Sequence, residues 1–219
     1  MRIIKIKGFS NTGKTATVVS LVAELRRRGY TVGTIKDIHF KAFEADRAGT
    51  DTYRHTQAGA CRVTARGPKS TAIIIDRQMD ADEILKYYKE DFLIIEGDCG
   101  IDCPEIITAK TADDIDKRMS ERAVAVSGVI SQTMADSGID EYGGLPVING
   151  ITEVEKLADL AEKATAAQEN ENDVELTIGG EEIWMVPFVK ETIKNVVTGA
   201  VKALDGYEDG KEIVIKIKR

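Results

Sequence analysis

The chain has 219 residues, of which 42% are hydrophobic and 5% aromatic, and it carries a formal net charge of −7 at pH 7. This length suits one α/β domain with a mainly aliphatic core and a small additional unit. The acidic balance argues against nucleic acid as a partner. No stretch approaches the ~18 consecutive apolar residues of a membrane span, and the sequence opens in a strand without a secretory signal. We therefore expect a cytoplasmic protein with no membrane partner.

The strongest motif is the run Gly8-Phe-Ser-Asn-Thr-Gly-Lys-Thr15, a complete G-x-x-x-x-G-K-T phosphate-binding loop. A β-rich run over residues 3–7 precedes it, and residues 16–25 follow with apolar side chains at helical spacing. The two glycines let the backbone wrap a polyphosphate, with N–H groups pointing inward. Lys14 is expected to reach the β- and γ-phosphates, and the Thr15 hydroxyl to ligate Mg²⁺. The motif predicts binding of a nucleoside triphosphate without identifying the base.

The next segments predict a strand, a loop, a short helix and a hairpin. A strand is expected at Thr31–Ile35. Residues 37–52 are polar and irregular, which is long for a plain connection and indicates a functional or mobile segment. A short helix is expected at Asp51–Ala58. Two runs, Cys61–Ala65 and Ser70–Ile75, predict a hairpin around a Gly-Pro turn.

The middle of the chain contains the most apolar predicted strand. Phe92–Ile95 is fully apolar, as expected for a strand that is covered on both faces, and a helix over Asp80–Tyr88 precedes it. Further strands are predicted at Ile106–Ala109, Ala123–Ile130 and Pro146–Ile148. A helix is expected to begin at Thr152, with Glu155 three residues later completing a capping box.

A separate small unit is predicted at the C-terminal end. Residues 165–173 are polar and indicate a frayed helix end and a linker. The alternating run Val174–Ile178, a Gly-Gly turn and a return strand over residues 183–186 predict a hairpin. A helix follows from Pro187, and a final strand is expected at Ile213–Ile217. Because such a unit buries little surface alone, we expect it to pack on the main domain or on a second chain.

These elements predict an α/β fold of the P-loop NTPase class, with a mainly parallel sheet flanked by helices. The nucleotide-binding domain is expected to span residues 1–164, the linker 165–173 and the α+β accessory unit, strand-strand-helix-strand, 174–219. In such open parallel sheets, ligands bind outside the carboxyl ends of the strands.

Carboxylates at this edge are candidates for work beside the phosphate loop. Glu96 ends the most apolar strand, so we expect it to organise Mg²⁺, directly or through a water, or to orient an attacking water. The alternative is a carboxylate that only marks the end of a buried strand. Asp37 follows the second strand and lies either near the nucleotide or at the start of a polar loop. His39 and His55 lack metal-ligand spacing with a cysteine pair and are read as polar loop or helix residues.

Several motifs occur in a characteristic order after the phosphate loop. They are Val32-Gly-Thr-Ile-Lys36, Asp46-Arg-Ala-Gly49-Thr-Asp51-Thr-Tyr53-Arg54, Ala58-Gly-Ala60, Ile94-Ile-Glu96-Gly97 and Pro146-Val147. In this order the chain, over residues 2–164, resembles the molybdopterin-guanine dinucleotide biosynthesis protein B family. The Asp-x-x-Gly-x-Asp segment followed by Ala-Gly-Ala is more specific than the phosphate loop, which many nucleotide-binding proteins share. The unit from residue 174 onward lies outside the common core.

The resemblance implies a GTP-binding protein with weak GTPase activity, using GTP and Mg²⁺ and typically forming a homodimer. It implies assistance to a guanylyltransferase partner that attaches GMP to molybdopterin, in molybdenum or tungsten cofactor biosynthesis. The nucleotide-binding residues carried over by position are Gly8, Asn11, Thr12, Gly13, Lys14, Thr15 and Ala16. Lys14 and Glu96 are carried over as catalytic, and Thr15 and Glu96 as metal-associated. Asp46, Gly49 and Asp51 belong to a loop near the anion or substrate site.

The chain departs from the family pattern at two residue positions and in the loop over residues 37–45, which is slightly longer than usual. Asp37 stands where the family usually has histidine, and Asp98-Cys99 stands where it usually has Phe-Lys. The second departure leaves open whether the anion contact of that lysine is made here.

Other functions also stay open at this point. In a metal-insertion GTPase, three cysteines would deliver the ion: Cys61, Cys99 and Cys103. In a small-molecule kinase, the candidates for an arginine-bearing lid are Arg62, Arg66 and Arg77. A non-catalytic module that reports nucleotide state is the remaining alternative. No guanine-reading Asn-Lys-x-Asp motif is visible, so the preference for GTP over ATP depends on the resemblance alone.

Overall fold

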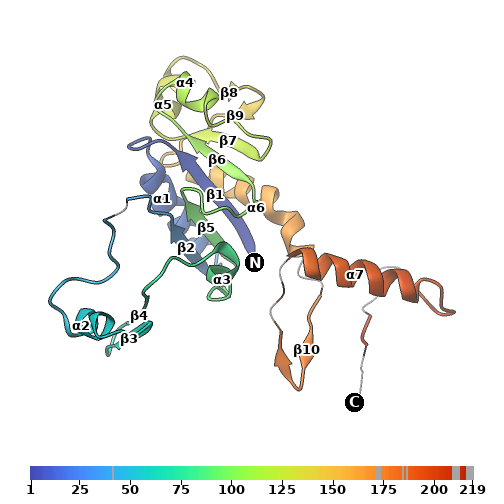
Figure 1. The fold of residues 1–219 in the computed structure, drawn as a ribbon. Coiled ribbons are helices and arrows are strands. Elements are labelled where there is room, and N and C mark those ends of the chain that lie inside the picture. Colours follow the sequence, from blue (N-terminus) through green and yellow to red (C-terminus); the bar gives the residue numbers. More distant parts are fainter. Residues whose placement is uncertain (41, 171–173, 184, 186, 209–212, 216–219) are drawn as a thin grey trace.

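The fold is built on a five-stranded parallel sheet, seen in a computed structural model that describes residues 1–40, 42–170, 174–183, 185, 187–208 and 213–215 (Figure 1). The strand order is β2-β5-β1-β6-β7, and each neighbouring pair is parallel. The strands are β1 (Arg2–Gly8), β2 (Val32–Lys36), β5 (Phe92–Glu96), β6 (Glu105–Thr108) and β7 (Ala123–Ser127). The predicted α/β class with a mainly parallel sheet is confirmed.

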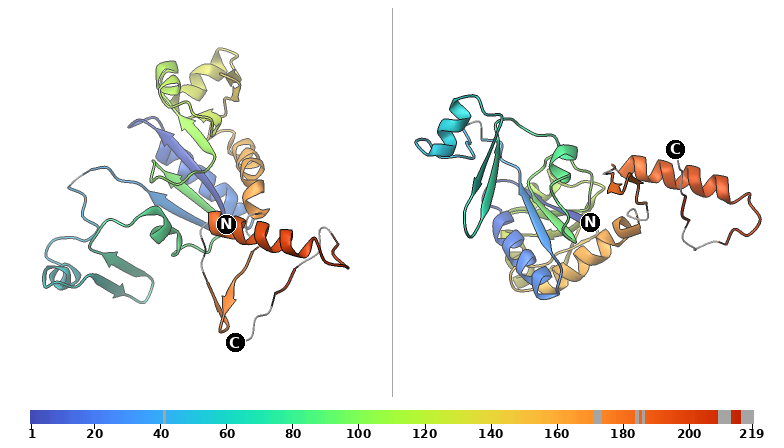
Figure 2. Two further views of the ribbon diagram at one scale, coloured as in Figure 1. Left: turned by 45° about the vertical axis from the view of Figure 1, so that its right-hand side comes forward. Right: turned by 90° about the horizontal axis from the view of Figure 1, so that it is seen from below.

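Helices cover both faces of this sheet (Figure 2). On one face, Ile4 and Ile6 of the central strand pack in a core with α1 (Lys14–Arg27) and α6 (Val154–Asn170). On the other face, Leu93 and Ile95 pack with α3 (Ala81–Leu85) and with the segment after β5. All five residues of β5 are buried, because the strand is sandwiched between both layers. The predicted apolar strand is therefore confirmed, while α3 ends earlier than expected.

The β6–β9 region differs from the prediction. The strand expected over Ala123–Ile130 ends at Ser127, and α5 (Val129–Asp136) begins after Gly128. Apolar residues on both sides of Gly128 look continuous in the sequence, but its positive φ of 85° breaks the strand. The run at 146–148 contributes only an isolated bridge and the edge of a hairpin. The further elements here are α4 (Ala112–Asp116), β8 (Glu141–Tyr142) and β9 (Leu145–Pro146).

Helix α6 also corrects two expectations. It begins at Val154, and the turn before it is held by Asn149, whose Oδ1 accepts from the backbone N–H groups of residues 151 and 152. The capping box predicted from Thr152 and Glu155 is therefore wrong. The helix continues through Asn170, six residues into the predicted linker. Gln168 explains this extension, because its amide donates to the Ile3 carbonyl at 3.1 Å and accepts from the Ile3 N–H at 2.5 Å.

A small α/β lobe stands apart from the main sheet (Figure 1). It contains α2 (Asp51–Gln57) and the antiparallel hairpin of β3 (Arg62–Arg66) and β4 (Thr71–Ile75), so both predictions for this segment are confirmed. The Thr50 hydroxyl caps α2 by accepting from the Tyr53 N–H. No residue of α2 is buried, which leaves this lobe open to further contacts.

The C-terminal region forms a short hairpin and a helix that extends away from the sheet (Figures 1 and 2). The hairpin joins β10 (Thr177–Ile178) to β11 (Glu181–Glu182) through the predicted Gly-Gly turn, and α7 (Pro187–Val201) follows. The expected return strand over 183–186 is shorter and earlier, with residues 184 and 186 outside the described part. The expected final strand is wrong for residues 213–215, which are not in a strand, and residues 216 and 217 lie outside the described part. Among the described residues, no helix is long and apolar enough to cross a bilayer.

Candidate functional site

The phosphate-binding loop leaves the carboxyl end of the central strand β1 and enters helix α1. Asn11 has a φ of 59° and Gly13 a φ of 99°, so the backbone turns through left-handed conformations that let successive N–H groups point to one side. Gly13 is the N-cap of α1, and no side chain forms a capping hydrogen bond there. The first turn of the helix contains no acidic residue. The first N–H groups of the helix are therefore disposed for an anion, aided by the positive end of the helix dipole.

Two glycines allow the loop to pack against neighbouring strand ends. A Cβ atom at Gly8 would lie 2.3 Å from the Thr108 carbonyl oxygen of β6. A Cβ atom at Gly128 would lie 2.2 Å from the Thr12 carbonyl oxygen, which accepts a hydrogen bond from the Val129 N–H at 3.0 Å. The loop is thus held from the β6 and β7 side. The roles of Thr108 and Gly128 carry no signal in the sequence, because they depend on close approach between segments distant in the chain.

Lys14 and Thr15 lie where the motif requires them. The Lys14 ammonium donates to the carbonyl oxygens of Gly8 at 2.9 Å and of Phe9 at 2.5 Å, so it lies over the first half of the loop. Burial lowers the pKa of Lys14, and the charges of Lys36 and Arg118 lower it further, against the opposing effect of Glu96. The Thr15 hydroxyl, at the start of α1, donates to Glu96 Oε1 at 2.7 Å.

Glu96 joins this group from the end of β5. Its side chain is only 10% exposed, and Lys36 from the end of β2 donates to the same Oε1 at 2.7 Å. Burial by itself would raise the pKa of Glu96, but the hydrogen bonds from Lys36 and Thr15 and the charges of Lys36 and Lys14 outweigh it and hold this pKa below its ordinary value. The carboxylate therefore stays ionised next to the phosphate loop.

Lys14, Thr15 and Glu96 line a cavity of about 800 Å³. Its charged walls carry Lys7, Lys14, Lys36, Arg118, Asp37, Glu96 and Asp98. Asp37 begins the polar loop, where its Oδ2 lies 3.2 Å from His39 Nε2 and its N–H donates to the Glu96 carbonyl at 2.9 Å. The structure thus brings Asp37 and His39 to the cavity, whereas His55 does not line it.

An ion-pair network lies on the sheet beside this cavity, where the chain departs from the family pattern. Lys5 is buried and donates to Asp98 at 2.8 Å and to Glu105 at 3.3 Å. Lys7 lies 3.4 Å from Glu105, and Ser120 donates to the same carboxylate at 2.7 Å. Because each buried charge has an opposite partner and hydrogen bonds, the network avoids the large cost of an unpaired buried ion. Asp98 therefore has a structural partner in this chain.

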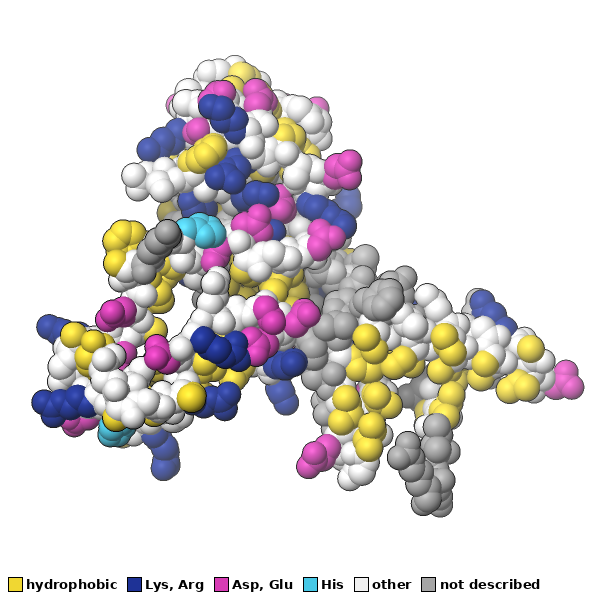
Figure 3. Space-filling view, in the orientation of Figure 1, with side chains coloured by type: hydrophobic (Ala, Val, Ile, Leu, Met, Phe, Trp, Pro, Cys, Tyr) yellow, Lys and Arg dark blue, Asp and Glu magenta, His cyan; other side chains and the backbone are white. Residues whose placement is uncertain are grey.

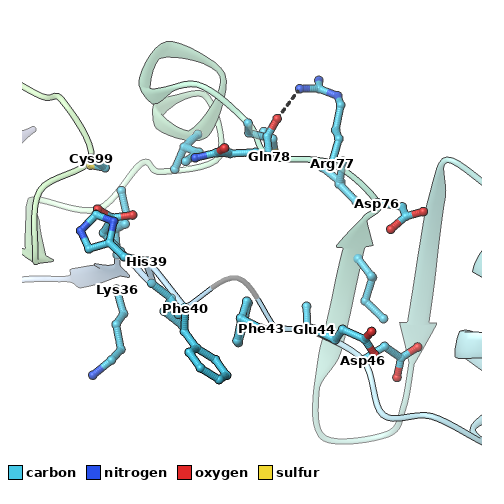
Figure 4. Close-up of a pocket in the computed structure, with 18 of the residues that line it drawn as sticks. Lys36, His39, Phe40, Phe43, Glu44, Asp46, Asp76, Arg77, Gln78 and Cys99 are labelled. Carbon is cyan, nitrogen blue, oxygen red and sulfur yellow. Dashed lines mark hydrogen bonds and ion pairs between the residues drawn. The ribbon is translucent and has the colours of Figure 1, made fainter.

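A second cavity, of about 1280 Å³, adjoins the first and shares six lining residues with it: Lys36, Asp37, Ile38, His39, Phe40 and Asp98. Figure 4 shows Phe40 and Phe43, from the segment after β2, across the opening from Arg77 and Gln78, which follow β4. Its lining carries more carboxylates than cations: Asp37, Glu44, Asp46, Asp76, Asp80 and Asp98 against Lys36 and Arg77. The phosphate-loop cavity is therefore the better electrostatic match for a polyphosphate.

The loop predicted near the anion or substrate site is not brought to the phosphate loop. Asp46 lines the second cavity, and its Oδ1 accepts from the Arg47 N–H at 2.7 Å and from the Thr50 hydroxyl at 3.1 Å. Gly49 and Asp51 line neither cavity, and Asp51 is exposed and pairs with Arg54 at 3.4 Å. Contact of Asp46, Gly49 and Asp51 with a ligand therefore stays a prediction.

The cysteines lie in different environments. Cys61 is exposed beside β3, Cys99 is half-buried, and Cys103 is buried. Burial raises the pKa of the Cys103 thiol to about 12, which keeps it protonated and a poor metal ligand. Within the part of the chain that the structure describes, no group of three or more histidine, cysteine or acidic side chains is arranged to hold a metal ion.

Comparison with known proteins agrees with this architecture. The model of a family described as molybdopterin guanine dinucleotide synthesis protein B, MobB, matches residues 3–132. The chain belongs to the MobB family. A relative from Methanocaldococcus jannaschii, provisionally named a molybdopterin-guanine dinucleotide biosynthesis adapter protein, is 24% identical over 241 residues, covering 99% of this chain and 97% of the relative. The adapter protein of that name from Haemophilus influenzae is 27% identical over 100 residues, covering 43% of this chain and 56% of the relative.

Solved MobB structures share the fold. The crystal structure of Bacillus subtilis MobB matches with a TM-score of 0.60 at 22% identity, covering 75% of this chain and 98% of that one. The MobB homologue from Bacillus stearothermophilus matches with a TM-score of 0.55 at 18% identity, covering 76% and 99%. These matches confirm the predicted P-loop NTPase fold. The alignment with the Methanocaldococcus relative spans nearly the whole chain and therefore includes the C-terminal region.

Proposed function

We propose that this chain is a GTP-binding adaptor that assists the attachment of GMP to molybdopterin, in the biosynthesis of the molybdenum or tungsten cofactor. In this proposal it binds GTP with Mg²⁺ at the Gly8–Thr15 loop and hydrolyses it slowly. Its partners are molybdopterin, a guanylyltransferase and a second copy of the chain, in the cytoplasm. The observation that carries the proposal is the convergence of Lys14, Thr15 and Glu96 in a chain of the MobB family.

The oxygen atoms beside the loop suit a magnesium ion. The Thr15 hydroxyl and a Glu96 carboxylate oxygen are 2.7 Å apart, and both are the hard oxygen ligands that Mg²⁺ prefers. The Lys36 ammonium lies 2.7 Å from that carboxylate oxygen and 3.4 Å from the hydroxyl, so the pair already accommodates a positive charge. Bound there, Mg²⁺ would neutralise charge on the phosphates. Lys14 would bind the β- and γ-phosphates, and Glu96 would orient the ion or the attacking water.

A molybdopterin-binding measurement tests the adaptor proposal. The chain should bind purified molybdopterin, or its complex with the guanylyltransferase, more tightly when GTP and Mg²⁺ are present than when both are omitted. The expected coupling lies in the 5- to 150-fold range, roughly the usual range for two linked sites. Binding at the same affinity with and without nucleotide would count against an adaptor that responds to GTP. If the chain bound neither molybdopterin nor its complex with the guanylyltransferase, the proposed place in cofactor biosynthesis would be wrong.

The C-terminal unit is proposed to support the homodimer. Val189 and Val196 of α7, Ile178 of the hairpin and Leu204 are exposed apolar side chains, and Figure 3 shows hydrophobic groups gathered along this part of the molecule. Exposed apolar side chains that gather on one part of a molecule indicate an interaction site. It lies outside the phosphate-loop cavity, so we expect it to serve assembly rather than nucleotide chemistry.

A truncated chain tests this role. The cut belongs after Asn170, because a cut near residue 164 would remove Gln168 and its two hydrogen bonds to Ile3 of β1. We expect the chain 1–170 to bind nucleotide like the full chain but to form a weaker dimer in sedimentation, since the apolar surface of α7 is gone. An unchanged oligomeric mass would remove the assembly role. Loss of nucleotide binding by a still-folded truncation would show that the unit contributes to the site.

A further inference from the structure

Arg118 lies against the phosphate-binding loop from an element that the P-loop motif does not include. It follows α4 and lines the same cavity as Lys14 and Glu96. Its guanidinium carbon lies 4.3 Å from the centre of the Phe9 ring, the second residue of the loop motif. Stacking of this kind orients the planar guanidinium and leaves its outer N–H groups available to an acceptor.

The position of Arg118 is fixed by buried packing. Thr111 and Asp114 form a capping box at the start of α4, and Ile115 is fully buried in a cluster with Val126. The Arg118 N–H donates to the Ile115 carbonyl at 2.9 Å, so the residue continues the last turn of the helix. An arginine held by a packed helix and an aromatic ring is preorganised, which lowers the entropic cost of binding an anion.

The guanidinium of Arg118 is available to an external acceptor. Within the described ranges no carboxylate pairs with it. Its Nε is buried and has no hydrogen-bond partner, so a ligand in the cavity would be met by the terminal N–H groups. By contrast, Arg122, four residues later, pairs with Asp102 at the surface.

The Lys14 side chain indicates which phosphate Arg118 would meet. The lysine of a P-loop reaches the β- and γ-phosphates, and here the Lys14 ammonium lies against the carbonyls of Gly8 and Phe9. The terminal-phosphate end of the site is therefore at the first half of the loop, beside the Phe9 ring that Arg118 covers. The charge of Arg118 also contributes to the lowered pKa of Lys14, as expected for two cations facing one cavity.

We infer that Arg118 is a terminal-phosphate contact of the nucleotide site, positioned by Phe9, that makes the site favour a nucleoside triphosphate over a diphosphate. This inference rests on the proposed nucleotide-binding function. Its planar fork suits phosphate oxygens, and its contact with the γ-phosphate is lost once that group is gone. The site then distinguishes nucleotide states through a residue outside the loop motif.

Paired affinity measurements with a non-hydrolysable GTP analogue and with GDP test the inference. Arg118→Ala should weaken binding of the triphosphate analogue about tenfold or more and change GDP binding less than about twofold. Arg118→Lys keeps the charge without the planar fork, so its triphosphate affinity should lie between that of the parent and that of Arg118→Ala. This variant also keeps the test possible if Arg118→Ala does not fold. Arg122→Ala is the matched control and should bind both nucleotides like the parent.

Phe9 provides an independent readout. Phe9→Leu should weaken triphosphate binding in the parent but add little in the Arg118→Ala background, because the two residues act as one unit. Equal losses for triphosphate and diphosphate, or unchanged triphosphate binding by both Arg118 variants, would overturn the inference while leaving the proposed function standing. A parent chain whose nucleotide binding is absent, or is unaffected by Lys14→Ala, would overturn the proposed function and this inference with it.

Discussion

Glu96→Gln should lower nucleotide hydrolysis about 10²-fold, at the lower end of what a positioned acid–base group contributes, while changing nucleotide affinity little. The substitution keeps the shape of the side chain and removes its charge. In the structure this carboxylate is largely buried and hydrogen-bonded to Thr15 and Lys36, which hold its pKa below the ordinary value. Its proposed work lies on the metal shell or the attacking water, and that work needs the negative charge. Single-turnover hydrolysis of GTP, measured beside nucleotide affinity, separates the two effects.

The matched control is Glu24→Gln. Glu24 is also a buried glutamate with two cationic partners, since it accepts from Arg27 at 2.7 Å and from Arg28 at 2.8 Å, but it lies on α1 outside the cavity. Its loss should affect stability and leave the hydrolysis rate per bound nucleotide unchanged. Undiminished turnover in Glu96→Gln would show that Glu96 only marks the end of a buried strand and takes no part in hydrolysis.

Lys14→Ala should weaken triphosphate binding at least about tenfold, because a charge-assisted hydrogen bond contributes ~1.5–3 kcal/mol and 1.4 kcal/mol corresponds to a factor of ten. Its ammonium bridges the carbonyls of Gly8 and Phe9, directly over the loop that would hold the phosphates. Thr15→Ala should weaken binding mainly when Mg²⁺ is present, since its hydroxyl is the proposed metal ligand. Equilibrium binding of a fluorescent GTP analogue, with and without Mg²⁺, distinguishes the two variants.

The exposed Lys163, on α6 and outside both cavities, supplies the control for Lys14. Lys163→Ala removes the same charge from the chain without touching the loop, so its affinity should equal that of the parent. If Lys14→Ala also bound like the parent, the assignment of the nucleotide to this loop would be wrong.

The parts of the fold that the sequence predicted are those set by local pattern. The strand-loop-helix around Gly8–Thr15 and the apolar run of β5 carry their own signals, namely a motif and burial on both faces. The convergence of Thr15 with Glu96 was also predictable, because parallel strands deliver their carboxyl ends to one edge.

The residues that the sequence did not reveal depend on tertiary contact. Gly128 looks like the middle of an apolar strand until its approach to Thr12 is seen. Arg118 has no motif, and its relation to Phe9 arises only when α4 packs beside the loop. The polar residues after 164 resembled a linker because the sequence does not show that Gln168 bonds to β1. In each case the deciding partner lies far away in the chain.

Nucleotide binding by the Gly8–Thr15 loop is measured by a calorimetric titration of the intact chain with GTP and with ATP, each in the presence of Mg²⁺. We expect GTP to bind at one site per chain, more tightly than ATP, and Lys14→Ala to weaken this binding at least about tenfold. Absence of binding by either nucleotide, or GTP binding that is unchanged in Lys14→Ala, would show that the Gly8–Thr15 loop is not a nucleotide site. Tighter binding of ATP than of GTP would contradict the proposed GTP-dependent adaptor.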